Sequence, residues 1–223
     1  KGKICFKESH YKKRKMGKSM INSKEEKRNF YKTVIALVIP MALQNLINVG
    51  VTAADVVMLG KVSEKVLSGA SLAGQIQYIM VLFLFGLTSG ATVLTAQYWG
   101  KGDKTAIEKI LALGIRSAVI VTAIFTIAAF TIPASLMRIF TNDPQVITEG
   151  VKYLRIVACS YIIMGITNVY LYVMRSIERV IVATVVYLAS FLCNVIFNAI
   201  FIFGLFGFPA LGIRGAAIAT LIA

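Results

Sequence analysis

The sequence predicts an all-α fold: a polytopic membrane protein built as a six-transmembrane-helix bundle. Hydrophobic residues make up 57% of the 223 residues, charged residues make up 15%, and the mean hydropathy is +0.76. A soluble domain carries nearer a quarter charged residues. The charges also leave long uncharged runs, which are Thr33–Ala54, Val66–Gly100, Ser117–Met137, Ile156–Met174, Ile181–Ile213 and Gly215 to the end.

The bilayer core needs about 20 apolar residues in a helix. Five of these runs reach or approach that length, and the sixth is cut off by the end of the sequence. Lipid offers no hydrogen-bond partner to the backbone, so each run must be a helix or part of a closed barrel. The period-two alternation of barrel strands is absent. We therefore expect helices over about 33–59, 63–100, 105–139, 144–176, 180–203 and 211–223.

Local signals divide these helices. Ser63 provides an amino-terminal cap for the second helix, which charge placement favours as one long helix rather than two short ones. Asp143 caps the fourth helix, with Pro144 at its first position. The sixth helix runs to the last residue without a closing polar segment, so we expect the sequence to be a fragment.

Residues 1–32 form a basic segment that holds 12 of the 24 Lys and Arg residues and three acids. This pattern fits a tail that binds nucleic acid or anionic lipid, or a cytoplasmic flank that follows the positive-inside rule, which is the favoured interpretation. Met20 is a plausible native start, in which case residues 1–19 are not native. We expect a cytoplasmic amino terminus in a cell inner or plasma membrane, with residues 33–223 as the transmembrane lobe.

Cysteine and histidine usage argues against an enzyme or a metal site. Cys5, Cys159 and Cys193 form no CxxC pair, and His10 is the only histidine. No nucleophile–base pair is visible. We expect no catalytic residue, no metal and no cofactor.

The first predicted helix carries a polar stripe at spacings of three, four and three: Asn45, Asn48, Thr52 and Asp55. Such a stripe lies on one helical face and should face protein or a water-filled cavity rather than lipid. Asp55 is the only acid in the first predicted helix, and its carboxylate can hold Na⁺ or exchange a proton. The alternative is an interfacial Asp near the outer surface.

Two asparagines share a face of the fifth predicted helix, Asn194 and Asn198. Their side chains can coordinate a cation or bind substrate, or they can join helices by hydrogen bonds. Further candidates for a polar cavity wall, with packing as the alternative, are Gln75, Tyr78 and Asn168. Pro40 should kink the first helix and is a candidate hinge. Gly86 and Gly90 form a GxxxG pattern that favours close helix approach.

Several segments, taken in order, resemble the multidrug and toxic compound extrusion (MATE) family. They are Pro40 followed by Asp55–Gly60, then Gly86–Gly90 leading to Ala96–Asp103, then Tyr153–Ile156, Asn194–Asn198 and Gly207–Thr220. The resemblance runs from about residue 33 to the end.

The resemblance implies twelve helices in two six-helix lobes, of which this chain would be the first, with a carboxy-terminal lobe missing. It implies export of cationic or amphipathic drugs and metabolites by antiport with Na⁺ or H⁺ through alternating access, with small organic cations as substrates. Asp55 would take part in cation coupling, with Tyr153, Asn194 and Thr220 around it. A branch of the family has a second acid at the position where this sequence has Asn198.

Two other functions remain open from the sequence. One is a lipid-linked oligosaccharide flippase of the same superfamily, although the predicted spans hold few basic residues, Arg116 and Arg155 near their ends. The other is a non-transport membrane protein that binds anionic lipid through the basic tail. The expected partners are small organic cations, membrane lipids and the missing lobe, without nucleic acid.

Overall fold

The computed structural model describes residues 24–207 and 209–223, except for the side chains of 24–26 and 206. Cys5, His10, Met20 and most of the basic segment therefore lie outside the described residues. The chain divides into two parts, Lys1–Ala42 and Leu43–Ala223. The second part contains the core and the site.

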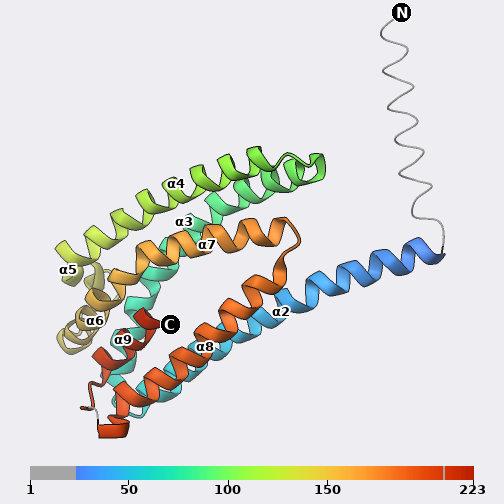
Figure 1. Ribbon diagram of the computed structural model, residues 1–223. Coiled ribbons are helices and arrows are strands. Elements are labelled where there is room, and N and C mark those ends of the chain that lie inside the picture. Colours follow the sequence, from blue (N-terminus) through green and yellow to red (C-terminus); the bar gives the residue numbers. More distant parts are fainter. Residues whose placement is uncertain (1–23, 208) are drawn as a thin grey trace, which may run out of the picture. The chain divides into compact units, whose positions relative to one another are not determined.

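The described residues form helices and turns, without strands. The helices, in chain order, are α2 (Lys24–Gly60), α3 (Glu64–Lys101), α4 (Lys104–Thr131), α5 (Pro133–Arg138), α6 (Pro144–Val157), α7 (Tyr161–Ser176), α8 (Val180–Phe203) and α9 (Ile213–Ile222), with 3₁₀ turns η1 (Ala158–Ser160) and η2 (Leu205–Gly207) (Figure 1). Five stretches are long and apolar enough to cross a membrane, namely Lys27–Gly60, Glu64–Lys101, Lys104–Thr131, Pro144–Ser176 and Val180–Phe203. The predicted all-α membrane fold is confirmed.

Exposed apolar side chains are typical of a lipid-facing surface. Along α4, the side chains of Leu113, Ile120, Ile124 and Ile127 are each at least 60% exposed. Their spacing of seven, four and three places them on one helical face. A stripe of this kind has no place on a water-soluble surface but is stable against lipid.

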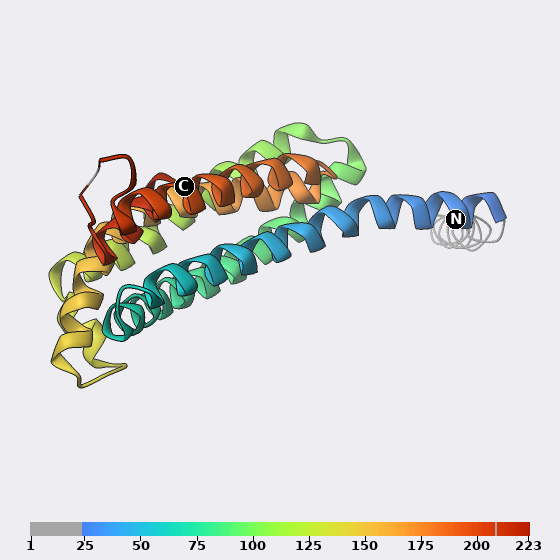
Figure 2. The ribbon, with the colours of Figure 1, turned by 90° about the horizontal axis from the view of Figure 1, so that it is seen from below.

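The main core lies among α3, α4, α6, α7 and α9. Met80, Leu154 and Tyr161 are fully buried there, together with Met137 of α5 and Ala217 of α9. Helix α3 packs against both α4 and α6, and α9 packs between α6 and α8 (Figures 1 and 2). This arrangement places α9, the short last helix, against α6.

Glycines set the closest helix crossings. A Cβ on Gly69 of α3 would lie 2.8 Å from the backbone nitrogen of Gly150 in α6, so only hydrogen atoms fit between these backbones. By contrast, a Cβ on Gly86 or Gly90 would meet nothing within 4 Å. The GxxxG pattern therefore mediates no close approach among the described residues, contrary to the expectation from the sequence.

Three element boundaries differ from those expected. Helix α2 extends back to Lys24 rather than beginning near Thr33. The expected start was the first residue of the uncharged run, but charged residues also form helix. The segment expected as one helix over 105–139 is divided at Ile132 (φ −127°, ψ 42°), because Pro133 has no N–H and its ring disfavours helical geometry in the preceding residue. The segment 144–176 contains the 3₁₀ turn η1, where the hydroxyl of Ser160 donates to the carbonyl of Val157 (2.7 Å).

Other local expectations are confirmed. Residues 64–101 form one continuous helix, and the Ser63 hydroxyl accepts from the backbone N–H of Lys65. Asp143 caps α6 by accepting from the backbone N–H groups of Gln145 and Val146, with Pro144 at the first position.

Substitution of Gly69 by alanine should destabilise the protein by about 1–3 kcal/mol, because the added methyl group forces α3 and α6 apart. The gain in helix propensity, at most about 1 kcal/mol, does not offset this. The matched control is Gly86→Ala, which adds a methyl group to open space and should be neutral or stabilising. The thermal unfolding midpoints of the purified proteins in detergent test this, and equal midpoints for the two variants would contradict the crossing.

Candidate cation site between helices α2 and α8

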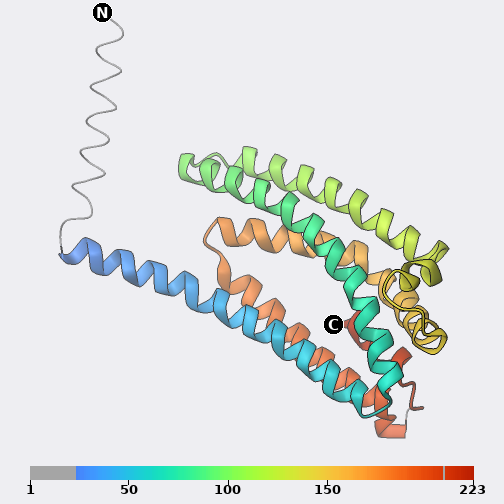
Figure 3. The same cartoon turned by 180° about the vertical axis from the view of Figure 1, so that it is seen from behind.

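Residues 43–60 of α2 lie beside α8 and run in the same direction (Figures 1 and 3). Three contacts show this, since the partner residue on α8 rises along with the residue on α2: Gln44 with Thr184, Gly50 with Phe191, and Asp55 with Asn198. The first and fifth spans of a chain that crosses a membrane back and forth must run in parallel. The contacts therefore agree with five successive crossings.

A polar cluster lies at the far end of this contact. The Asn198 side chain is fully buried, and its Nδ2 donates to the Asp55 carboxylate at 2.5 Å and to Asn194 Oδ1 at 2.9 Å. Asp55 itself is half-buried. The Oδ1 of Asn198 is buried without a hydrogen-bond partner. A carboxylate and two amide oxygens therefore lie together at this end of the contact between α2 and α8.

Helices α6 and α9 add two hydroxyl groups to the cluster. Tyr153 of α6 forms a side-chain hydrogen bond with Thr220 of α9 and interacts electrostatically with Asp55. Helix α9 lies this close because Gly215 has no Cβ, which would otherwise collide with the backbone carbonyl of Phe201 in α8. The structure thus brings together all five residues expected around a coupling cation, from four helices.

The structure does not bring together the residues expected to line a substrate cavity. Asn45, Asn48 and Thr52 are exposed on α2. Asn48 and Thr52 border a hollow of about 430 Å³ whose other lining residues, Val49, Ala53 and Val56, come from the same helix. The polar stripe is therefore divided, since Asp55 points to α8 and the other three lie on an open face.

The other three predicted cavity residues lie apart from Asp55. Gln75 and Tyr78 are exposed on α3. Asn168 of α7 is partly buried and donates to the carbonyl of Met164 in its own helix (2.9 Å). No hydrogen bond among the described residues joins these side chains to the polar cluster.

Gln44 is a polar residue that the sequence reasoning missed. It is only 1% exposed, and its Nε2 donates to the carbonyl of Val180 (3.2 Å) and to the hydroxyl of Thr184 (2.7 Å). The available signal was helical spacing, because Gln44, Ile47, Val51 and Asp55 follow at three, four and four residues. Asp55 belongs to this buried face as much as to the polar stripe.

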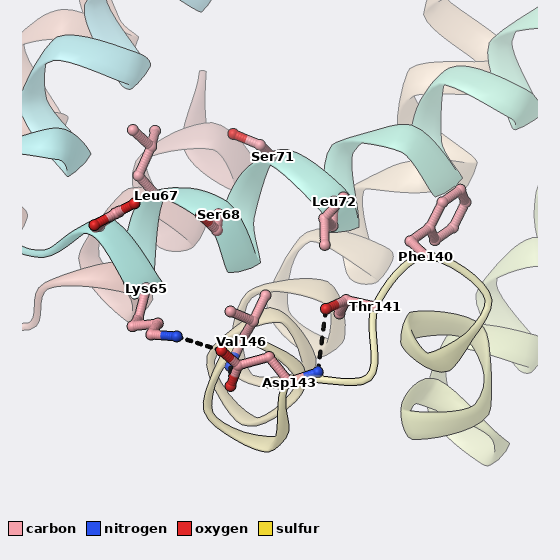
Figure 4. Close-up of a pocket in the computed structure, with 10 residues that line it drawn as sticks. Lys65, Leu67, Ser68, Ser71, Leu72, Phe140, Thr141, Asp143 and Val146 are labelled. Atoms are coloured by element: carbon pink, nitrogen blue, oxygen red, sulfur yellow. Dashed lines mark hydrogen bonds and ion pairs between the residues drawn. The ribbon is translucent and has the colours of Figure 1, made fainter.

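A second hollow, of about 580 Å³, lies between the start of α3 and the segment that enters α6. Figure 4 shows Lys65 of α3 reaching Asp143, which caps α6, with Thr141 beside it. The hydrogen bond from Lys65, followed by those from the backbone N–H groups of α6, lowers the pKa of Asp143. This ion pair joins two helix starts and is a structural contact.

Comparison with known families identifies the family of this chain. The family model named MatE matches residues 40–200, which is most of the chain. The chain belongs to the MatE family. This confirms the resemblance stated from the sequence, and with the apolar helices it makes the chain part of a multi-pass membrane protein.

Several MatE relatives are similar along nearly the whole chain. "Probable multidrug resistance protein NorM" of Thermotoga maritima is 28% identical over 204 residues, which cover 89% of this chain and 43% of that protein. The protein of the same name from Bacillus licheniformis is 32% identical over 205 residues, with the same coverage. The chain thus spans somewhat less than half the length of these relatives.

Solved structures share the fold. The structure titled "Outward-facing conformation of a multidrug resistance MATE family transporter of the MOP superfamily" superposes with a TM-score of 0.77 at 21% identity, over 86% of this chain and 42% of that one. "Crystal structure of MATE in the bent conformation" gives the same TM-score, identity and coverage.

Replacing Asn198 by alanine should cost about 1–3 kcal/mol of stability, because Asp55 and the buried Asn194 both lose their donor. Asn48→Ala is the control, since the Asn48 side chain is exposed and removal of its amide should change stability by less than about 0.5 kcal/mol. Chemical or thermal unfolding in detergent measures both. A variant at 198 as stable as the control would show that the bonds to Asp55 and Asn194 do not form.

Proposed function

We propose that the complete MatE protein containing this chain is a secondary antiporter that exports small organic cations in exchange for Na⁺ or H⁺. The observation that carries the proposal is the cluster at Asp55, where one carboxylate lies with Asn194, Asn198, Tyr153 and Thr220. The names of the relatives, multidrug resistance proteins, support the substrate class.

The donor set at Asp55 suits a small hard cation or a proton. Na⁺ prefers oxygen ligands, and the cluster offers the carboxylate of Asp55, the unpartnered Oδ1 of Asn198 and the Oδ1 of Asn194. Because Asn198 stands where a second acid would add a negative charge, the cluster carries one charge. A single Na⁺ or a single proton neutralises it, and this is the stoichiometry that we propose for this lobe.

Coupling follows if the cation and the organic substrate bind different conformations of the same helices, because binding of one then disfavours binding of the other. In our proposal the cation binds Asp55 from outside, α2 rearranges with Pro40 as its hinge, and substrate leaves outward. Because exchange of one Na⁺ or H⁺ for one monovalent organic cation moves no net charge, the concentration gradient of the coupling ion drives export, and a tenfold ion gradient supports about a tenfold substrate gradient. In this proposal the amino terminus is cytoplasmic in the inner or plasma membrane, and the basic cluster at 101–109 and Arg179 lie on the same side.

Changing Asp55 to Asn should abolish cation-driven efflux in the complete protein, at least tenfold, with expression unchanged, because the site loses its only carboxylate. Efflux of a fluorescent organic cation from proteoliposomes under an imposed Na⁺ or H⁺ gradient measures it. The matched control is Asp103→Asn, the same chemical change at an exposed helix cap that Asn can also provide. Undiminished efflux in Asp55→Asn would rule out the assignment.

Deletion of residues 1–19 should leave efflux within about twofold of the intact protein, because transport needs the helices and not the basic segment. The same deletion should abolish function if the protein acts by binding anionic lipid through that segment. Flotation with vesicles that contain phosphatidylserine, compared with neutral vesicles, separates a loss of lipid binding from a loss of transport.

A further inference from the structure

One face of α8 carries a layered sequence of side chains from its first residue to the polar cluster. Val180, Thr184, Tyr187, Phe191, Asn194 and Asn198 follow at spacings of four, three, four, three and four, which places them on one side of the helix. Tyr187 and Asn198 are separated by about 16 Å along the axis. Any path that leads from Asp55 along this face towards the start of α8 passes the intervening layers.

The layer nearest to the start of α8 closes the contact with α2. Gln44 Nε2 donates to the Val180 carbonyl and to the Thr184 hydroxyl, and the side chain is almost fully buried. Its Oε1 is buried without a partner. Because one acceptor has no hydrogen bond among the described residues, this contact is less stable than a fully bonded one.

The next layer carries a positive charge. The Arg175 guanidinium of α7 lies over the ring of Tyr172, 5.0 Å from its centroid, and over that of Tyr187 at 5.5 Å. The two ion pairs of the described residues are Lys65–Asp143 and Lys152–Glu149, so no carboxylate neutralises Arg175 there. The nearest acid in sequence, Glu178, is exposed in the turn between α7 and α8. Arg175 Nε is buried without a partner.

An aromatic layer separates this charge from Asp55. The ring of Phe191 lies 3.5 Å from where a Cβ of Gly50 would be, so α2 and α8 meet here through a glycine and an apolar ring. This layer offers no ligand to a cation. The order from Asp55 towards the start of α8 is therefore carboxylate and amides, apolar ring, positive charge, and hydrogen-bonded Gln44.

We propose that Arg175, held between Tyr172 and Tyr187 and closed off by Gln44, is an electrostatic barrier that prevents the coupling cation at Asp55 from crossing the lobe along α8. Fixed positive charges exclude cations from pores in this way. The proposal rests on cation coupling at Asp55, as proposed above, and in that topology the barrier lies at the cytoplasmic end. Cation exchange at Asp55 is then tied to the helix movement that carries substrate.

If the Arg175 charge acted only through its place at the end of α7, it would not need to lie over the rings of Tyr172 and Tyr187. An arginine in the last turn of α7 also favours a cytoplasmic position and interacts well with the helix dipole. Arg179 has the same charge, lies four residues further on at the start of α8 and is exposed. Substitutions of the two arginines therefore distinguish two explanations. A barrier requires Arg175 alone, whereas an effect of positive charge near the membrane surface requires both residues.

The test is passive cation leak through the complete protein in proteoliposomes, without organic substrate. Na⁺ or H⁺ entry is followed with an indicator under an imposed gradient. At an effective dielectric constant of about 20, a charge within about 10 Å changes the passage rate of a cation by more than tenfold. Arg175→Gln should therefore raise the leak about tenfold, Arg175→Lys should raise it less than threefold, and Arg179→Gln should leave it unchanged.

Two further variants complete the test. Asp55→Asn added to Arg175→Gln should return the leak to the wild-type rate, because the leaking cation passes through the Asp55 site. Gln44→Leu removes two bonds without altering Arg175 and should raise the leak severalfold, so it decides the matter if Arg175→Gln does not fold. A wild-type leak in folded Arg175→Gln, or in Gln44→Leu where that variant must serve, would overturn the barrier.

The efflux assay and the leak assay together separate this inference from the proposed function. If wild-type protein shows no cation-driven efflux and Asp55→Asn changes nothing, the proposed antiport fails. If efflux is cation-driven and lost in Asp55→Asn, but Arg175→Gln and Arg179→Gln leak alike, only the barrier fails.

Discussion

The hydrogen bond between Asn198 and Asp55 is the interaction on which the rest of the site depends. In a bilayer, a carboxylate without a partner is costly, and helices associate by packing and by polar contacts rather than by hydrophobic force. Asn198 supplies Asp55 with a donor from another helix and holds Asn194 with its second hydrogen. One amide thereby sets where α2 and α8 meet and how the carboxylate is oriented.

Close packing of small residues places the other members of the cluster. Gly215 lets α9 approach the backbone of α8, and Gly69 lets α3 approach α6. The helices that cross here carry Thr220 and Tyr153, which form a hydrogen bond with each other, and Tyr153 interacts electrostatically with Asp55. Function in this lobe thus depends on positions that bear no functional group, because a single methyl group at either crossing would shift the helices that hold the ligands.

The two ends of the α2–α8 contact differ in chemistry, although each contains a buried oxygen without a hydrogen-bond partner among the described residues. At Asp55 the donors and acceptors can exchange partners with a cation, and at Gln44 a buried oxygen remains unpaired. Between them along α8 lie Phe191, which faces Gly50 of α2, and Tyr187, whose ring lies under the Arg175 guanidinium of α7. A helix held at two polar points with an apolar layer between them can move as a unit, which is the mechanical property that alternating access requires.

The sequence by itself determined the membrane fold, since uncharged runs of this length have no other stable conformation in lipid. It also indicated the helix caps at Ser63 and Asp143, because capping depends on neighbours in the chain. The break at Pro133 was readable from proline chemistry and was missed. Only the tertiary structure decided three further features. They are which asparagine contacts Asp55, the exposure of Asn45 and Asn48 on an open face, and the burial of Gln44. A helical period places residues on a face to within about a quarter turn, and the partner helix then selects which of them it covers.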